Sequence, residues 1–301
     1  MRKDIRRVGV IGLGAMGMGV AQSLLRGGFE VHACDVRADA VQKIVDAGGH
    51  RADSPAGLGK LVDALIILVV NADQTEAVLF GENGAAASLA PGSVVIASAT
   101  VSPEYARGLG KRLADMGLLM IDGPVSGGAA KAATGEMTVM AAGSPEAFAK
   151  CAGVLDAIAG KVYRLGDEPG PGSVTKMVNQ LLAGVHIAAA GEAMALAIRA
   201  GANPDQVYEV ICNSAGGSWM FQNRVPHILA GDYTPLSAVN IFVKDLGIVL
   251  DYAKKSIFPL PLSATAHQMF MQASAAGHGA EDDSAVIKTF PGITLPGKRG
   301  A

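Results

Sequence analysis

A strand followed by a glycine-rich turn is predicted by Val8-Gly9-Val10-Ile11-Gly12-Leu13-Gly14-Ala15-Met16-Gly17. The first four residues are typical of a buried strand, and the next six have the spacing G-x-G-x-x-G. In that spacing the first glycine allows a tight turn, the second lets a pyrophosphate approach the backbone, and the third lets the following helix pack closely. The N-terminus of that helix then faces the phosphates. The stretch therefore predicts a dinucleotide-binding unit.

An acidic residue at the end of the next apolar run strengthens this interpretation. The run Glu30 to Cys34 is followed by Asp35, eighteen residues after Gly17. A carboxylate at this place accepts hydrogen bonds from the ribose hydroxyls of NAD and repels the 2′-phosphate of NADP. Arg37, two residues later, would partly offset that repulsion. We therefore expect NAD as the cofactor, held by Gly12, Leu13, Gly14, Ala15, Met16, Gly17 and Asp35.

Composition excludes several other classes of function. The net charge is −2, no basic run occurs and only 5% of residues are aromatic, so we expect no nucleic-acid partner. The three cysteines, Cys34, Cys151 and Cys212, are scattered without the spacing of metal ligands. We therefore expect no disulfide and no metal site, and a reducing compartment, the cytoplasm.

The first part of the chain alternates short apolar runs with helical stretches. This rhythm is typical of a parallel sheet with crossover helices, and it predicts an α/β Rossmann domain with a mostly parallel, doubly wound sheet. The expected strands are Val8–Ile11, Glu30–Cys34, Leu65–Val70, Val94–Ala97, Leu118–Ile121, Met137–Ala141 and Val162–Leu165. Helices are expected to begin at Ser54-Pro55, Ser102-Pro103 and Ser144-Pro145, where serine caps and proline occupies the first turn.

The pattern changes after Pro169-Gly170-Pro171-Gly172, beyond which we find helical periodicity and no convincing strand. We therefore expect an NAD-binding domain over residues 1–168 and an all-α substrate and dimerisation domain over residues 169–301. Leu181 to Ala200 is mostly apolar but contains His186, Glu192 and Arg199. Such groups are rare inside a membrane, so we expect a helix buried between domains or against a second subunit, and no membrane partner.

Three segments carry candidate chemistry. In Asp122 to Gly128, the Ser126 hydroxyl and the amides of Gly127 and Gly128 are suited to a carboxylate, although a simple glycine turn explains them equally well. Lys176 shares a helical face with Asn179 and Gln180. A partly buried lysine has a lowered pKa and exchanges protons near neutral pH, whereas an exposed first-turn lysine would have no such role. The third segment contains Lys244, which by itself is best explained as a solvated lysine at a helix end.

Together the glycine motif, Asp122 to Gly128, Lys176 to Gln180 and Lys244-Asp245-Leu246 resemble the β-hydroxyacid dehydrogenase family in order and spacing. The resemblance implies a Rossmann domain, a helical domain that interlocks in dimers or tetramers, and hydride transfer between a nicotinamide and a small hydroxy acid. It implies that Lys176 is the catalytic acid/base. It further implies that Ser126, Gly127 and Gly128 hold the substrate carboxylate, that Asn179 orients the substrate and that Thr100 and Lys244 contact the cofactor.

One segment departs from the family pattern. The family's loop near the nicotinamide reads acid-x-Ser-Thr, whereas this chain has Ala97-Ser98-Ala99-Thr100 and keeps only the threonine. This segment, with Ser218 to Arg224, resembles a branch that oxidises a four-carbon sugar acid. By the same resemblance Trp219, Phe221 and Arg224 lie near the substrate, although Trp219 is equally well explained as a core residue. Three-carbon or branched hydroxy acids, and a non-catalytic NAD sensor, remain alternatives.

Overall fold

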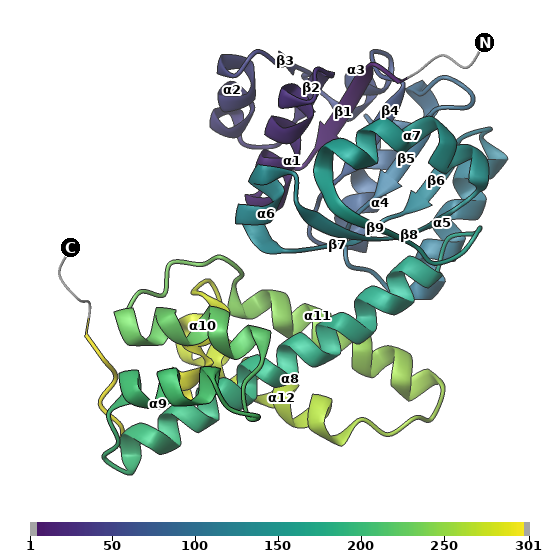
Figure 1. The fold of residues 1–301 in the computed structure, drawn as a ribbon. Helices are drawn as coiled ribbons and strands as arrows, with labels where there is room; N and C mark the ends of the chain where they lie inside the picture. Colours follow the sequence, from purple (N-terminus) through teal and green to yellow (C-terminus); the bar gives the residue numbers. More distant parts are fainter. Residues whose placement is uncertain (1–4, 298–301) are drawn as a thin grey trace. The chain divides into compact units, whose positions relative to one another are not determined.

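The computed structural model describes residues 5–297 as two compact units, which divide after Lys176 (Figure 1). The first unit contains a sheet with helices, and the second consists of helices.

The sheet of the first unit is mostly parallel. Its strand order is β3-β2-β1-β4-β5-β6-β8-β7, with β9 paired to β8. Neighbours from β3 to β6 are parallel, whereas β8 runs antiparallel to both β6 and β7. The strands are β1 (Arg7–Ile11), β2 (Glu30–Cys34), β3 (His50–Arg51), β4 (Ala64–Ile67), β5 (Val94–Ala97), β6 (Leu119–Asp122), β7 (Val125–Ser126), β8 (Met137–Gly143) and β9 (Ala159–Arg164). This confirms the predicted Rossmann sheet.

Alternate residues of the strands pack on opposite faces of the sheet. In β4, Ala64 and Ile66 face one apolar cluster and Leu65 and Ile67 face the other. The first cluster is covered by α1 (Ala15–Arg26), α2 (Ala38–Asp46), α6 (Gly128–Thr134) and α7 (Pro145–Ile158). The second is covered by α3 (Pro55–Gly59), α4 (Ala72–Phe80) and α5 (Pro103–Asp115), with the short 3-10 helix at Ala86–Ser88. Because both faces are buried there, the central strands β4 and β5 are apolar throughout.

The three predicted serine–proline helix starts are confirmed. Ser54, Ser102 and Ser144 each accept a hydrogen bond from a backbone N–H in the first turn of α3, α5 and α7. In each helix proline follows at a position that needs no N–H partner.

Some strand boundaries differ from the prediction. β4 ends at Ile67 and not at Val70: the N–H of Leu68 still donates to the carbonyl oxygen of Ile11, but residues 68–70 are outside the strand. The two-residue strands β3 and β7 were not predicted, since two residues give no alternating pattern.

The second unit is helical, as predicted: its described residues hold one isolated bridge, between Ala238 and Asp282, and no strand. Helix α8 (Pro171–Arg199) begins in the first unit and continues into the second. It is followed by α9 (Pro204–Cys212), α10 (Trp219–Ala230), α11 (Val239–Lys255) and α12 (Pro261–Ala273), a π-turn at Ser274–His278 and a 3-10 helix at Asp283–Thr289.

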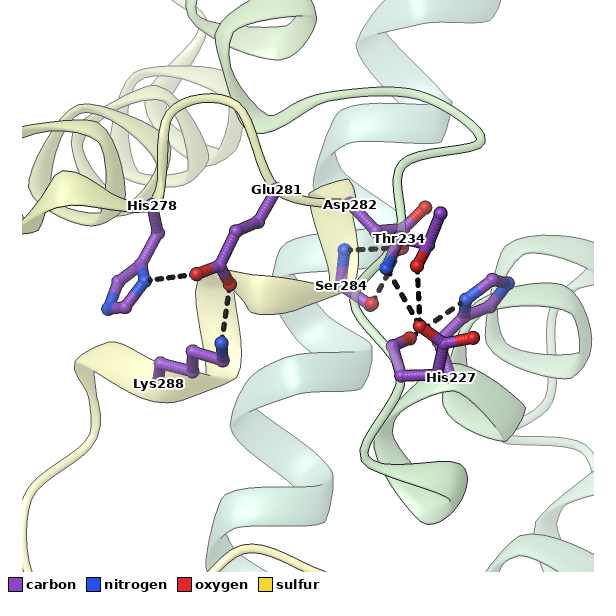
Figure 2. Close-up of polar contacts among 8 residues, drawn as sticks. His227, Thr234, His278, Glu281, Asp282, Ser284 and Lys288 are labelled. Atoms are coloured by element: carbon purple, nitrogen blue, oxygen red, sulfur yellow. Dashed lines mark hydrogen bonds and ion pairs between the residues drawn. The ribbon is translucent and has the colours of Figure 1, made fainter. Parts of the chain in front are cut away.

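Polar contacts hold the segment from His278 to Lys288 in place (Figure 2). The Glu281 carboxylate pairs with His278 and Lys288. Asp282 is fully buried, and its carboxylate accepts hydrogen bonds from the backbone N–H and the hydroxyl of Ser284 and from the N–H of Leu236. These contacts compensate the cost of burying a carboxylate.

Helix α8 is long and apolar enough to cross a membrane by length and composition alone, and it is the one such helix among residues 5–297. Within this chain, 39% of its most apolar stretch is buried. We expected α8 to be buried on every side, but other parts of the same chain cover only part of it.

Candidate active site

The glycine turn lies at the switch point of the sheet, because β1 is flanked by β2 on one side and β4 on the other. Gly12 has φ of +90°, and a Cβ there would lie 2.6 Å from the carbonyl oxygen of Leu68. A Cβ on Gly17 would lie 1.8 Å from the carbonyl oxygen of Gly12. In contrast, a Cβ on Gly14 would meet nothing within 4 Å. Two glycines therefore serve packing, while Gly14 borders open space at the start of α1.

The acid predicted to bind ribose lies against this turn. Asp35 accepts a hydrogen bond from the backbone N–H of Leu13, and its other oxygen accepts from the N–H of Arg37 at 2.8 Å. The Arg37 guanidinium pairs with the same carboxylate at 3.1 Å. Burial opposes ionisation of Asp35, but the hydrogen bonds from Arg37 and Leu13 outweigh it and lower the pKa of the carboxyl group. Asp35 is thus an anion fixed beside the glycine turn.

The turn, the helix N-terminus and Asp35 together fit a dinucleotide. Open backbone at Gly14 leaves room for a pyrophosphate, and an ionised carboxylate near Leu13 is suited to ribose hydroxyls. Thr100 follows β5 at the same edge of the parallel sheet and is half-buried.

The predicted carboxylate loop also has the backbone conformation that glycine favours. Ser126 ends β7, Gly127 has φ of +133° and Gly128 has φ of +73°. α6 begins at Gly128, where a Cβ would meet nothing within 4 Å. The space beside Gly128 is open, which leaves room for a ligand next to the backbone of this loop.

Lys176 is buried against this loop. Its side chain comes from the second turn of α8, the residue is 8% exposed, and its Nζ donates a hydrogen bond to the carbonyl oxygen of Val125 at 2.9 Å. Val125 directly precedes Ser126. The structure therefore favours the buried alternative for Lys176 over the exposed one, and it brings the lysine to the candidate carboxylate loop within the first unit.

Asp122, the first residue of that loop, is also buried. Its carboxylate accepts hydrogen bonds from the N–H groups of Gly170 and Ser173, each at 2.9 Å, and from the Ser173 hydroxyl at 2.7 Å. Burial raises the pKa of the Asp122 carboxyl group, and the Ser173 hydrogen bonds counteract part of that rise. The sequence alone does not single out Asp122, because a polar residue after a strand is common in loops.

In the second unit, Asn179 and Lys244 are connected by side chains. The amide of Asn179 donates to Gln180 at 3.0 Å, the amide of Gln180 donates to Asp245, and Asp245 pairs with Lys244 at 2.6 Å. Asp245 is 2% exposed; it belongs to the Lys244-Asp245-Leu246 motif, but the sequence predicted no role for it. The sequence did contain a signal for a buried acid: Asp245 lies at helical spacing from Phe242, Leu246 and Val249, which are buried. A carboxylate within such an apolar stripe needs a polar partner.

The residues predicted near the substrate from α10 have different environments. Trp219 begins the helix and is 57% exposed, so it is not a core residue of the second unit. Phe221 is buried and stacks on Tyr208. Arg224 is buried and pairs with Asp283 at 2.6 Å, which gives it a structural contact. Asp283 is buried as well, and burial raises its pKa to about 6.

The first unit therefore contains two features of a dehydrogenase site. The glycine turn and Asp35 fit a dinucleotide, and the amine of Lys176 lies beside the loop Ser126 to Gly128, which is suited to bind a carboxylate. A lysine in its unprotonated form, in contact with a substrate hydroxyl, can accept the hydroxyl proton while hydride leaves the carbon that bears this hydroxyl. Among residues 5–297 no group of three or more His, Cys, Asp or Glu side chains is arranged to hold a metal ion.

Both parts of the chain match families of NAD-binding dehydrogenase domains. Residues 7–166 match the family described as the NAD binding domain of 6-phosphogluconate dehydrogenase. Residues 170–290 match the family described as NAD-binding of NADP-dependent 3-hydroxyisobutyrate dehydrogenase.

Individual relatives match over nearly their whole length. An L-threonate dehydrogenase of Cupriavidus necator is 69% identical over 97% of this chain and 99% of its own. An L-threonate dehydrogenase of Escherichia coli strain K12 is 56% identical over 97% of each chain. A crystal structure titled 3-hydroxyisobutyrate dehydrogenase, from Salmonella typhimurium, is 54% identical with a TM-score of 0.90 and covers 94% of this chain and 99% of its own. The chain therefore belongs to the β-hydroxyacid dehydrogenase family typified by 3-hydroxyisobutyrate dehydrogenase, and it is an NAD-binding oxidoreductase.

Proposed function

We propose that this protein oxidises L-threonate to 2-dehydro-L-erythronate with NAD, in the catabolism of sugar acids in the cytoplasm. Support comes from relatives named L-threonate dehydrogenase at 56% and 69% identity over 97% of the chain. In this proposal residues 1–168 bind NAD, and residues 169–301 complete the substrate site and mediate oligomerisation.

Each candidate residue has a defined task. Ser126, Gly127 and Gly128 bind the substrate carboxylate, and Asn179 and Trp219 contact the remaining hydroxyls. Lys176 Nζ, in its unprotonated form, accepts the proton of the C2 hydroxyl. Bound NAD supplies the nicotinamide ring that accepts the hydride from C2. Thr100 and Lys244 contact the cofactor, in addition to the glycine turn and Asp35.

The observation that carries this proposal is the anchoring of Lys176. A buried lysine whose Nζ hydrogen-bonds the residue directly before Ser126 holds its amine beside the place proposed for the substrate carboxylate. A 2-hydroxy acid bound there presents its hydroxyl one carbon away from the carboxylate. Proximity of this kind is what general acid/base catalysis requires.

Replacement of Lys176 tests the assignment. Lys176→Ala is expected to lower kcat by about 10²–10⁴-fold with NAD affinity little changed, the range for a positioned acid/base. Lys111→Ala is the matched control, because Lys111 is exposed on α5, which packs on the opposite face of the sheet from α6. Near-normal turnover of the Lys176 variant would disprove the general-base role.

A substrate panel tests the specificity. We expect the highest kcat/KM on L-threonate when NADH formation is followed with hydroxy acids of three to six carbons. A higher kcat/KM on 3-hydroxyisobutyrate would instead indicate a 3-hydroxyisobutyrate dehydrogenase. A higher kcat/KM for the oxidation of glycerate, or for the reduction of tartronate semialdehyde, would indicate a 2-hydroxy-3-oxopropionate reductase. With NADP in place of NAD we expect a lower kcat/KM, because Asp35 is ionised beside the ribose site.

A non-catalytic NAD sensor is the alternative from another class. A sensor has no need of a buried lysine beside an anion loop, so the geometry of Lys176 favours an enzyme. NAD binding without turnover of any hydroxy acid would favour the sensor.

We further propose a homodimer or homotetramer. Val178, Leu182 and Leu196 share one face of α8 and are 50%, 49% and 69% exposed. Beside that face a groove of about 370 Å³ is lined by Met177, Val178, Leu181, Val249, Tyr252, Ala253, Ser256, Phe258 and Leu260. An apolar surface of this kind is typical of a subunit interface. Light scattering at micromolar concentration should give at least twice the chain mass, and a monomer mass would contradict the proposal.

A further inference from the structure

Asp122 connects the end of strand β6 to the start of helix α8. It is 1% exposed, and its two carboxylate oxygens have separate tasks. Oδ2 accepts the backbone N–H groups of Gly170 and Ser173, whereas Oδ1 accepts the Ser173 hydroxyl. The first N–H groups of a helix have no partner within the helix, so Asp122 acts as a cap supplied from another part of the chain.

The helix that Asp122 caps carries Lys176. Ser173 lies three residues before Lys176, which is less than one helical turn. The lysine head group is held by Val125, three residues after Asp122. The segment from Asp122 to Val125 therefore holds both ends of Lys176. Asp122 binds the first turn of the helix from which the side chain extends, and Val125 binds the Nζ atom at its end.

The first turn of α8 is packed closely against the sheet. A Cβ on Gly172 would lie 2.5 Å from the carbonyl oxygens of both Asp122 and Met140. The first turn of α8 thus lies directly against β6 and β8. The hydrogen bonds to Asp122 fix its position along these strands.

We propose that Asp122 is a positioning residue for the reaction, which sets the place of Lys176 relative to the carboxylate loop through its hydrogen bonds to Ser173 and Gly170. This inference rests on the proposed acid/base role of Lys176. Asp122 itself touches neither substrate nor cofactor in this proposal.

Hydrogen-bond geometry, and not negative charge, is the property that matters. An asparagine can place its oxygen where Oδ2 accepts the two N–H groups. Its amide then donates to Ser173 Oγ, because a hydroxyl is both donor and acceptor. An alanine removes all three contacts.

Steady-state kinetics of substituted full-length enzyme test the proposal. Asp122→Ala is expected to lower kcat by about 10²-fold, since a displacement of about 1 Å can have that effect on catalysis. NAD affinity should remain within about twofold, because the glycine turn is untouched. Asp122→Asn is expected to keep kcat within about threefold of the unsubstituted enzyme, which is the rescue that a positioning role predicts.

A matched control separates positioning from stability. Asp282→Ala removes a buried aspartate that holds a serine hydroxyl and backbone N–H groups in the same way, but in the second unit and outside the candidate site (Figure 2). We expect it to lower the melting temperature as Asp122→Ala does, while leaving kcat unchanged at a temperature where both variants are folded.

Two results would overturn the proposal: a folded Asp122→Ala enzyme with kcat within twofold of normal, or equal losses in the Ala and Asn variants. If Asp122→Ala does not fold, Ser173→Ala decides, with an expected loss of about tenfold in kcat for one hydrogen bond to a carboxylate. Unchanged kcat in that variant would reject positioning. Lys176→Ala keeps the two hypotheses apart, because normal turnover in that variant would reject the acid/base role itself.

Discussion

The two glycine-rich loops of the first unit differ in what requires their glycines. In Gly12–Gly17, a side chain at Gly12 or Gly17 would collide with backbone atoms of the protein. In Gly127–Gly128, both residues have positive φ; a Cβ at Gly127 would lie 2.9 Å from the flexible side chain of Lys131, and one at Gly128 would enter open space. The first loop is thus dictated mainly by internal packing and the second by backbone conformation.

This difference shows at which glycines a substitution can reveal a bound ligand. A glycine that packing requires would be needed with or without a cofactor. Gly14 and Gly128 are more informative, because a Cβ at either position would have no protein atom within 4 Å and therefore no steric conflict. Three substitutions test whether the comparison holds.

The largest effect is expected at Gly17. Its Cβ would lie 1.8 Å from the carbonyl oxygen of Gly12, so Gly17→Ala must move the backbone of the turn. A shift of about 1 Å should weaken NAD binding by about 10²-fold. Calorimetric titration with NAD measures this, and an unchanged Kd would show that the turn is not held by close packing.

A smaller effect with a different signature is expected at Gly14. Gly14→Ala creates no clash in the protein, and its φ of −62° suits alanine. We therefore expect the melting temperature to change by less than about 1 °C, while NAD affinity falls by about tenfold, or about 1.4 kcal/mol, because the Cβ occupies space needed by the pyrophosphate. Unaltered NAD affinity would place the pyrophosphate elsewhere.

The smallest effect is expected at Gly128. Gly128→Ala retains φ of +73° at a cost of about 1–2 kcal/mol, which lowers the melting temperature by a few degrees. If its N–H binds the substrate carboxylate, KM for the hydroxy acid should rise by a few-fold while KM for NAD stays constant. A parallel rise in both KM values would contradict separate roles for the two loops.

Local patterns allowed much of the fold to be predicted. The strand at Val94–Ala97 matches the prediction at both ends, because a buried strand is a continuous apolar run bounded by turns. The strand at Glu30–Cys34 also matches at both ends, although it includes Glu30 and His32. The serine–proline helix starts are equally local signals. In contrast, strands β3 and β7 each have two residues, and their pairing partners are distant in sequence.

The site was less predictable because burial and partners are properties of the fold. Whether Lys176 was buried could not be read from its helix, since the loop that covers it contributes Val125 from 51 residues away. Asp122 likewise finds Gly170 and Ser173 only in three dimensions. Arg224, expected near the substrate, is paired with Asp283, and an ion pair between residues so far apart has no signature in one sequence.

Helix α8 has a consequence for how this protein can vary in length. Lys176 ends the first unit, and Asn179 and Gln180 lie in the second, yet all three belong to one uninterrupted helix. Most sequence insertions are absorbed by loops, but one residue inserted between Lys176 and Asn179 would turn the following side chains by about 100° around the helix axis. The number of residues between Lys176 and the two amides therefore sets the angle between them around the helix axis, so any insertion or deletion in this interval would change that angle.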